Sequence, residues 1–367
     1  MRKLQALIVI LSCYFHSFSQ NLDSLKNVLD SIAKSENVVG MSVAIIEKGE
    51  ISWFHQYGLK KEGVNEKIDS STIFRCASIS KPITALGVLK LHEEGKIHLD
   101  SNVNIYLKDW KLKMNRYTKD SIITIRRLLS HTGGINFHGG GEFDQTKDVP
   151  NIIEVLNGKA YSPKIKAKRI PGTQFKYSGG GYTILEKIIE DVSGQSFSEF
   201  MEVNILKPLE MNRSTFKHLY AKDSIKNVAC GHWDDKTTLD DGWKLNSTIA
   251  AGGLWSTSGD LCKYIIEIQE ILNGKSDGIL KIETVREMLV PLIKSGDSND
   301  WALGPYVRQE SDGTWYFGHT GHNDGYHSIL DASFTISQGG FVFLVNTEVP
   351  LSFYSRIYTP VFDFYGW

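Results

Sequence analysis

The stretch Phe74-Arg75-Cys76-Ala77-Ser78-Ile79-Ser80-Lys81 joins a strand-rich beginning of the chain to a long apolar helix expected over residues 83–91. Residues at positions i and i+3 share one face of a helix, so the Ser78 hydroxyl and the Lys81 amine are expected to be neighbours. An amine whose pKa is lowered by desolvation or by nearby positive charge can take the proton of a serine hydroxyl. A serine in a first helical turn also keeps its backbone N–H free, and that N–H could help to bind an oxyanion.

The same Ser-x-x-Lys spacing occurs at Ser31/Lys34 and at Ser214/Lys217, so the spacing alone does not identify the nucleophile. Any of the three could be a solvated helix or turn. Ser31 lies within an amphipathic N-terminal helix, and Ser214 lies in a polar turn. Only Ser78 stands where strands give way to a long apolar helix, and we therefore predict that Ser78 is the nucleophile and Lys81 its partner.

The hydrophobic pattern predicts an α/β fold of the α+β kind. Residues 41–47 and 51–57 are apolar, β-branched and aromatic runs around Lys48-Gly49-Glu50, which is typical of a hairpin. The middle of the chain has helical spacing, at 83–91, 125–129, 184–192 and 261–272. Strands return at 304–308, 314–318, 326–330 and 340–346. We expect an antiparallel sheet flanked by helices, with a sheet lobe from residues 21–77 and 301–367 and a large, mostly helical lobe, 78–300, inserted.

The first residues are typical of a secretory signal peptide, expected over residues 1–20. A basic start, Met1-Arg2-Lys3, precedes an almost wholly apolar run over 4–11, and small residues follow at cleavage-like spacing. A hydrophobic core helix is the alternative, and Cys13 could instead be a lipidated cysteine. The protein is therefore expected to be exported to the periplasm or cell envelope. A lipoprotein and a secreted protein are the alternatives, with membrane association only if Cys13 is lipidated.

The composition narrows the class of partner. Of 367 residues, 23% are charged, the formal net charge is −1 and no long run has one sign, so nothing indicates a basic face for nucleic acid. Beyond Cys13, only Cys76, Cys230 and Cys262 remain, without metal-ligand spacing, and we expect each to be a small buried residue. No cofactor is expected, and the protein is expected to be a monomer.

A second candidate element is Tyr177-Ser178-Gly179-Gly180-Gly181-Tyr182. Four small residues between two tyrosines suit a tight loop at which the backbone approaches a ligand closely. A phenol beside a lysine ammonium loses its proton more easily, so Tyr177 could serve as a general base. The alternative is a glycine-rich turn whose tyrosines only pack.

A third element is Gly318-His319-Thr320-Gly321-His322, between two predicted strand segments. The N–H of His322 could be a second oxyanion donor, and His319 could orient the tyrosine or a substrate carboxylate. A histidine between glycines is otherwise a turn residue. His319, His322 and His327 lie close in sequence, but no H-E-x-x-H or comparable ligand set accompanies them, so no metal site is expected.

Together these elements resemble the serine β-lactamase and penicillin-binding-protein superfamily, most closely its class C-like branch, which includes D-alanyl-D-alanine carboxypeptidases, D-aminopeptidases and lipase-like esterases. The stretch 74–81 resembles the nucleophile motif. Tyr177-Ser178-Gly179 falls where the family carries Tyr-x-Asn, and His319-Thr320-Gly321 resembles Lys-Thr-Gly in its His-x-Gly form. Segments 123–134 and 251–257 are similar to family signatures, and the similarity spans about residues 38–347.

The resemblance implies a mixed sheet lobe and a helical lobe with the site between them. It implies that Ser78 attacks a carbonyl to form an acyl-enzyme, that Lys81 and Tyr177 move protons, and that the amides of Ser78 and His322 form an oxyanion hole. Which residue is the acylation base stays open. Gly179 departs from the family pattern. The family's Asn at this position hydrogen-bonds the amide side chain of a β-lactam or peptide, and loss of that contact costs about 1–3 kcal/mol of binding free energy.

Three functions follow as expectations. The first is a serine hydrolase that cleaves esters or small amide or peptide bonds of a small-molecule substrate. The second is a cell-wall D,D-carboxypeptidase or β-lactamase, and the third is a non-catalytic penicillin-binding or sensor protein. His131, although it lies in a signature-like segment, is expected to be structural.

Overall fold

An eight-stranded antiparallel sheet organises the computed structural model, which describes residues 22–139, 141–159, 163–223, 225–276, 278–296, 299–335 and 338–367. The strand order is β2-β1-β12-β11-β10-β9-β8-β7. The bounds are β1 Gly40–Glu47, β2 Glu50–Gly58, β7 Ile293–Lys294, β8 Asp300–Trp301, β9 Tyr306–Gln309, β10 Trp315–Asn323, β11 Tyr326–Ser333 and β12 Gly340–Val345. Because β1 pairs with β12, the two ends of the chain form one sheet, which confirms that expectation. The expected signal peptide and Cys13 lie outside the described residues.

The predicted hairpin is present as β1 and β2. Its connection places Lys48 at φ 56° and Gly49 at φ 80°, and two consecutive left-handed residues suit the twist of a tight hairpin. Along β1, side chains alternate between two cores: Met41, Val43 and Ile45 lie in one, and Ala44 and Ile46 lie in the other. The sheet is therefore covered on both faces.

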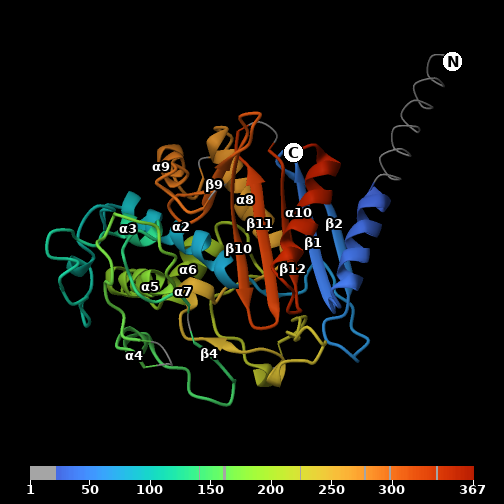
Figure 1. The fold of residues 1–367 in the computed structure, drawn as a ribbon, viewed down its shortest axis with the longest axis horizontal. Coiled ribbons are helices and arrows are strands. Elements are labelled where there is room, and N and C mark those ends of the chain that lie inside the picture. Colours follow the sequence, from blue (N-terminus) through green and yellow to red (C-terminus); the bar gives the residue numbers. More distant parts are fainter. Residues whose placement is uncertain are drawn as a thin grey trace.

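One face of the sheet is covered by the helix of residues 22–35 and by α10 (Ser352–Tyr365), which pack through Leu25, Leu29, Phe353 and Ile357. Figure 1 shows both helices beside β1 and β2, with the other helices grouped mainly on the opposite side. The remaining helices are α2 Ser80–Glu93, α3 Ile125–Leu129, α4 Ile152–Leu156, α5 Gly179–Ser193, α6 Phe197–Met201, α7 Ile249–Gly252, α8 Ser258–Leu272 and α9 Ile282–Met288. All four predicted helices are found, as α2, α3, α5 and α8.

Parts of the segment 78–300, which we expected to form the helical lobe, lie against the main sheet or within it. The helix α8, whose N-cap Thr257 accepts a hydrogen bond from the Asp260 N–H (3.1 Å), packs on β1 and β12. The strands β7 and β8 extend the sheet back to Ile293. Two small sheets, β3 (Phe74–Arg75) with β6 (Trp255–Ser256) and β4 (Glu142–Phe143) with β5 (Leu245–Asn246), lie outside the main one.

The strand that we expected to end at Gly318 continues to Asn323 as β10. Its partner β11 pairs with it along the whole length, from Tyr316↔Ser333 to Asn323↔Tyr326, so the motif 318–322 is part of a regular strand. His319 therefore lies in a strand, and the alternative interpretation of it as a turn residue is wrong. Among the described residues, no helix combines the length and the apolar character needed to cross a membrane.

Candidate active site

Ser78 lies on a short 3₁₀ turn, η1 (Ala77–Ile79), two residues before α2 begins. Ala77 holds a left-handed backbone (φ 47°), and such a conformation persists only where its surroundings impose it. The turn is fixed by two bonds: the Cys76 N–H donates to Leu254 O (2.9 Å), and the Ser80 hydroxyl donates to Ala77 O (2.6 Å). Ser78 is thereby presented, half-buried, to the cavity between the sheet and the helices.

Lys81 is buried, with 2% of its surface exposed, and its Nζ lies 2.9 Å from Ser78 Oγ. A second bond runs from Nζ to Ala251 O (2.6 Å), which fixes the amine beside the serine. Burial lowers the pKa of Lys81 to about 7. The expected adjacency is confirmed, and desolvation is the cause of the lowered pKa.

Tyr177 completes the group from the opposite wall. Its ring centroid lies 4.8 Å from Lys81 Nζ. A hydrogen bond with Ser78 acts to lower the pKa of Tyr177. That bond opposes a larger effect, because burial raises the pKa of Tyr177 above its usual value. The expectation that a neighbouring ammonium would lower the Tyr177 pKa is wrong, since desolvation dominates.

The glycine-rich loop is the start of α5, and its N-cap is Ser178. The Ser178 hydroxyl accepts from the Gly181 N–H (3.2 Å) and donates to Phe137 O (2.7 Å). The Ser178 N–H donates to His131 Nδ1 (3.1 Å), and the His131 ring lies 4.3 Å from that of Tyr177. His131 therefore packs against the Tyr177 ring and fixes the adjacent backbone, which agrees with the structural role predicted for it.

Position 179 has no room for a side chain, so glycine is sterically required there. A Cβ atom at this position would lie 2.7 Å from His138 O, whereas the nearest neighbour of a Cβ at Gly181 would be 3.6 Å away. The backbone of residues 137–139 occupies the space beside position 179. An Asn side chain at Gly179 would require that segment to move.

We expect Gly179→Ala to lower the free energy of unfolding by about 1–3 kcal/mol, because the added methyl group overpacks against a carbonyl. Gly181→Ala is the matched control on the same helix. It should leave stability unchanged or slightly raised, since alanine in a helix loses less entropy than glycine. Urea unfolding of both variants checks the prediction, and equal stabilities would contradict it.

The motif His319-Thr320-Gly321-His322 lies on β10, directly against the Ser78 turn. A Cβ at Gly321 would lie 2.5 Å from Cys76 O and 3.0 Å from the Ser78 nitrogen, so only glycine permits this approach. The Ser328 hydroxyl on β11 donates to Cys76 O (2.9 Å) and holds the turn there. The two amides expected to bind an oxyanion, those of Ser78 and His322, therefore belong to elements in contact.

His319 is 3% exposed and uncharged at neutral pH. Burial, and next the charge of Lys81, lower its pKa to about 3. Its Nδ1 is 2.5 Å from Thr320 O, and because a carbonyl only accepts, Nδ1 carries the proton. Its Nε2 is buried without a partner among the described residues.

The segment 251–257 packs behind the nucleophile. It supplies Ala251 O to Lys81, and its Leu254 N–H donates to Ser80 Oγ (2.9 Å). The buried Glu186 of α5 accepts from the Ala250 N–H (2.9 Å) and so secures α7. Burial raises the pKa of Glu186 to about 8. Glu186 was not among the predicted site residues, although an acidic residue inside an apolar helical run is a signal that could have identified it.

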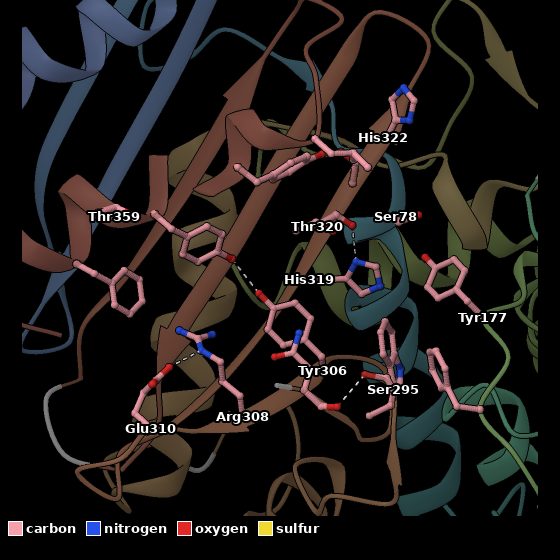
Figure 2. Close-up of a pocket in the computed structure, with 18 of the residues that line it drawn as sticks. Ser78, Tyr177, Ser295, Tyr306, Arg308, Glu310, His319, Thr320, His322 and Thr359 are labelled. Atoms are coloured by element: carbon pink, nitrogen blue, oxygen red, sulfur yellow. Dashed lines mark hydrogen bonds and ion pairs between the residues drawn. The ribbon is translucent and has the colours of Figure 1, made fainter. Parts of the chain in front are cut away.

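Two cavities meet at Ser78 and Tyr177. The larger, about 940 Å³, runs along β9 and β10 to α10. Figure 2 shows Ser78, Tyr177, His319 and Thr320 at one end of it, with Tyr306 and Arg308 further along. The smaller, about 240 Å³, is lined by polar groups that include Asn246 and Asn323. The aromatic walls of the larger cavity, Phe175, Trp301, Tyr306 and Phe362, had no sequence signal, because they come from separate connections and strands.

The two competing Ser-x-x-Lys pairs do not form such a group. Ser31 is exposed on the helix of residues 22–35. The Ser214 hydroxyl bonds Asp260 (2.9 Å), and Lys217 pairs with Glu202 (2.6 Å). The choice of Ser78 on position in the sequence agrees with this placement.

An antiparallel sheet and a helical lobe with a Ser-Lys-Tyr group between them define the β-lactamase/transpeptidase fold. A model of the Beta-lactamase family matches residues 25–360, and the chain belongs to that family. This family contains serine hydrolases, and membership therefore supports assignment of this protein as a hydrolase.

Relatives cover most of the chain. The solved penicillin-binding protein homologue of Pyrococcus abyssi, described as octameric, has a TM-score of 0.77 and 26% identity, and covers 94% of this chain and 77% of its own. Protein flp of Staphylococcus aureus (strain MW2) is 28% identical over 83% of this chain, and the match spans 59% of that protein's length. Penicillin-binding protein 4* of Bacillus subtilis is 24% identical over 83% of this chain and 68% of its own length. D-amino acid amidase of Ochrobactrum anthropi shares the fold, with a TM-score of 0.72 at 19% identity over 95% of this chain and 98% of its own.

Proposed function

We propose that the protein is a serine hydrolase that forms an acyl-enzyme on Ser78 and cleaves esters or small amide or peptide bonds. The observation that carries the proposal is the buried Lys81 amine, 2.9 Å from Ser78 Oγ, with a pKa of about 7. At neutral pH a large fraction of this amine is uncharged and can accept a proton. Strongly shifted pKa values cluster at functional sites, and this amine lines a cavity beside Ser78.

In the proposed reaction, the uncharged Lys81 amine takes the Ser78 proton while Oγ bonds to the substrate carbonyl carbon. The carbonyl electrons move to oxygen, and the amides of Ser78 and His322 stabilise that oxyanion. The oxyanion then collapses, the leaving group departs with a proton, and an acyl group stays on Ser78. The Lys81 ammonium returns this proton to the leaving group by way of the Tyr177 hydroxyl, which gives up one proton as it receives another and so remains a phenol, in keeping with its raised pKa. Lys81, uncharged once more, then takes a proton from the water that attacks the acyl carbon, and it passes that proton to Ser78 Oγ as the acid product leaves.

Two features favour a neutral ester or small amide over a β-lactam or a peptide with a terminal carboxylate. His319 stays uncharged, and Arg308, the nearby cation of the larger cavity, pairs with Asp331 and Glu310. Gly179 offers no side-chain amide, and the backbone of His138 occupies the space beside it. We therefore expect weak labelling of Ser78 by a fluorescent penicillin. Rapid, stoichiometric labelling would instead favour the carboxypeptidase, β-lactamase or sensor alternatives.

The pH dependence of ester hydrolysis tests the role of Lys81. We expect kcat/KM for a p-nitrophenyl ester to rise about tenfold per pH unit at low pH and to level off above about pH 7, because only the uncharged amine accepts the serine proton. Stopped assays over pH 5 to 9 would measure it. A profile that is flat across this range would contradict a Lys81 base.

We also propose that the protein is exported and that its substrate is a small molecule. The basic start, apolar run and small residues of positions 1–20 support a signal peptide and a location in the periplasm or cell envelope. The cavity of about 940 Å³ supports a substrate of drug-like size.

A further inference from the structure

Beyond the Ser78 group, the far end of β10 gathers two histidines and a glutamate. His322 and His327 are direct cross-strand partners on β10 and β11, and their rings stack at 4.4 Å with an interplanar angle of 16°. Glu348, which follows β12, places Oε1 2.8 Å from His322 Nε2 and 3.2 Å from His327 Nε2. Figure 2 shows the His322 side chain pointing away from Ser78 and Tyr177.

The pattern of donors and acceptors around His327 leaves no proton between His327 Nε2 and the Glu348 carboxylate. The Tyr354 hydroxyl donates its single hydrogen to Gly321 O (3.0 Å), so it accepts from His327 Nδ1 (2.8 Å), which must carry the ring proton. The His327 Nε2 lone pair then faces the Glu348 carboxylate oxygen at 3.2 Å. Two acceptors at this distance repel each other, and a cation between them would turn the repulsion into attraction.

The spacing suits a first-row divalent ion once the exposed His322 ring turns toward it, because two stacked rings direct their lone pairs in parallel. Ligands about 2.0–2.1 Å from a tetrahedral Zn²⁺ lie roughly 3.3 Å apart, close to the separations of Glu348 Oε1 from the two ring nitrogens. All three ligand atoms lie within 4.8 Å of one another. Imidazole nitrogen and carboxylate oxygen form a common zinc ligand set.

The outer contacts also match those of a metal site. A metal-bound histidine commonly donates its other ring N–H to a fixed acceptor, as His327 does to Tyr354. The second carboxylate oxygen of Glu348 accepts from the Gly325 N–H (3.1 Å), which orients Oε1 toward the histidines.

We propose that His322 Nε2, His327 Nε2 and Glu348 bind one zinc-class divalent ion, with water completing the coordination. No metal site was expected here, because no H-E-x-x-H or comparable ligand set accompanies the histidines in the sequence, but the fold supplies Glu348 from the end of another strand. His319 is not a ligand, because three residues along a strand place it on the opposite face from His322. Tyr354 links the site to Gly321, so metal binding would brace the strand that carries the His322 amide.

Calorimetric titration of zinc chloride into the metal-free protein tests the proposal, with the visible spectrum of the Co²⁺ form as a readout of four-coordinate geometry. We expect one saturable site in the wild type, and at least a tenfold loss of affinity in His322→Ala and in Glu348→Gln. His98→Ala, which removes an exposed histidine elsewhere, should bind zinc like the wild type. Thermal melts of the metal-free forms establish that each variant is folded, and His322, being 53% exposed, is the safer substitution.

Absence of saturable binding to the wild type would overturn the proposal. Equal affinity in wild type, His322→Ala and Glu348→Gln would overturn it as well, because the ion would then lie elsewhere. Neither result depends on ester hydrolysis, so this test and the test of the proposed function can fail separately.

Discussion

Ser78→Ala is expected to lower ester hydrolysis at least about a thousandfold, because the change removes the atom that forms the acyl bond. The fold should survive, since Ser78 is half-buried and the turn is held by Cys76, Ser80 and Ser328 rather than by the Ser78 hydroxyl. Release of p-nitrophenol by the wild type and the variant measures the effect.

Ser31→Ala is the matched control, because Ser31 has the same spacing to a lysine but lies exposed on the N-terminal helix. It should keep wild-type activity. If Ser78→Ala hydrolysed the ester as fast as the wild type, Ser78 would not be the nucleophile.

Lys81→Met is expected to lower kcat/KM for the same ester by about 10²–10⁴-fold, the range for loss of a positioned general base. Methionine keeps an unbranched, apolar side chain in a buried site, although Ala251 O loses its donor. The rise in activity below about pH 7 should disappear together with the amine. Comparison of the two pH profiles separates a lost base from a general loss of folded protein.

Lys34→Met is the matched control for this change, and it should leave both rate and pH profile unaltered. A Lys81→Met enzyme that retained the rise in activity near pH 7 would assign that rise to another group.

Local sequence patterns predicted the parts of this molecule that depend on neighbours along the chain. The hairpin of β1 and β2 follows from the apolar, β-branched and aromatic runs around Lys48-Gly49-Glu50, and α8 follows from the helical spacing of residues 261–272. The contact between Ser78 and Lys81 follows from helical spacing, and burial of that helix explains the amine pKa.

Features set by distant contacts were not predictable in the same way. The direction of the Tyr177 pKa shift depends on desolvation by surrounding side chains, which no spacing within its loop reveals. The reason for Gly179 lies in His138 O, about 40 residues earlier in the sequence, and the approach of Gly321 to the Ser78 turn joins two ends of the chain. Glu348 joins His322 and His327 only because β12 lies beside β11.

Intact-mass measurement after brief mixing with a p-nitrophenyl ester tests acyl-enzyme formation most directly. We expect the wild type to gain the mass of one acyl group, located by peptide mapping to the segment that contains Ser78, and Ser78→Ala to gain none. An adduct on a different residue, or rapid wild-type turnover with no adduct at any mixing time, would contradict the proposed acyl-enzyme on Ser78.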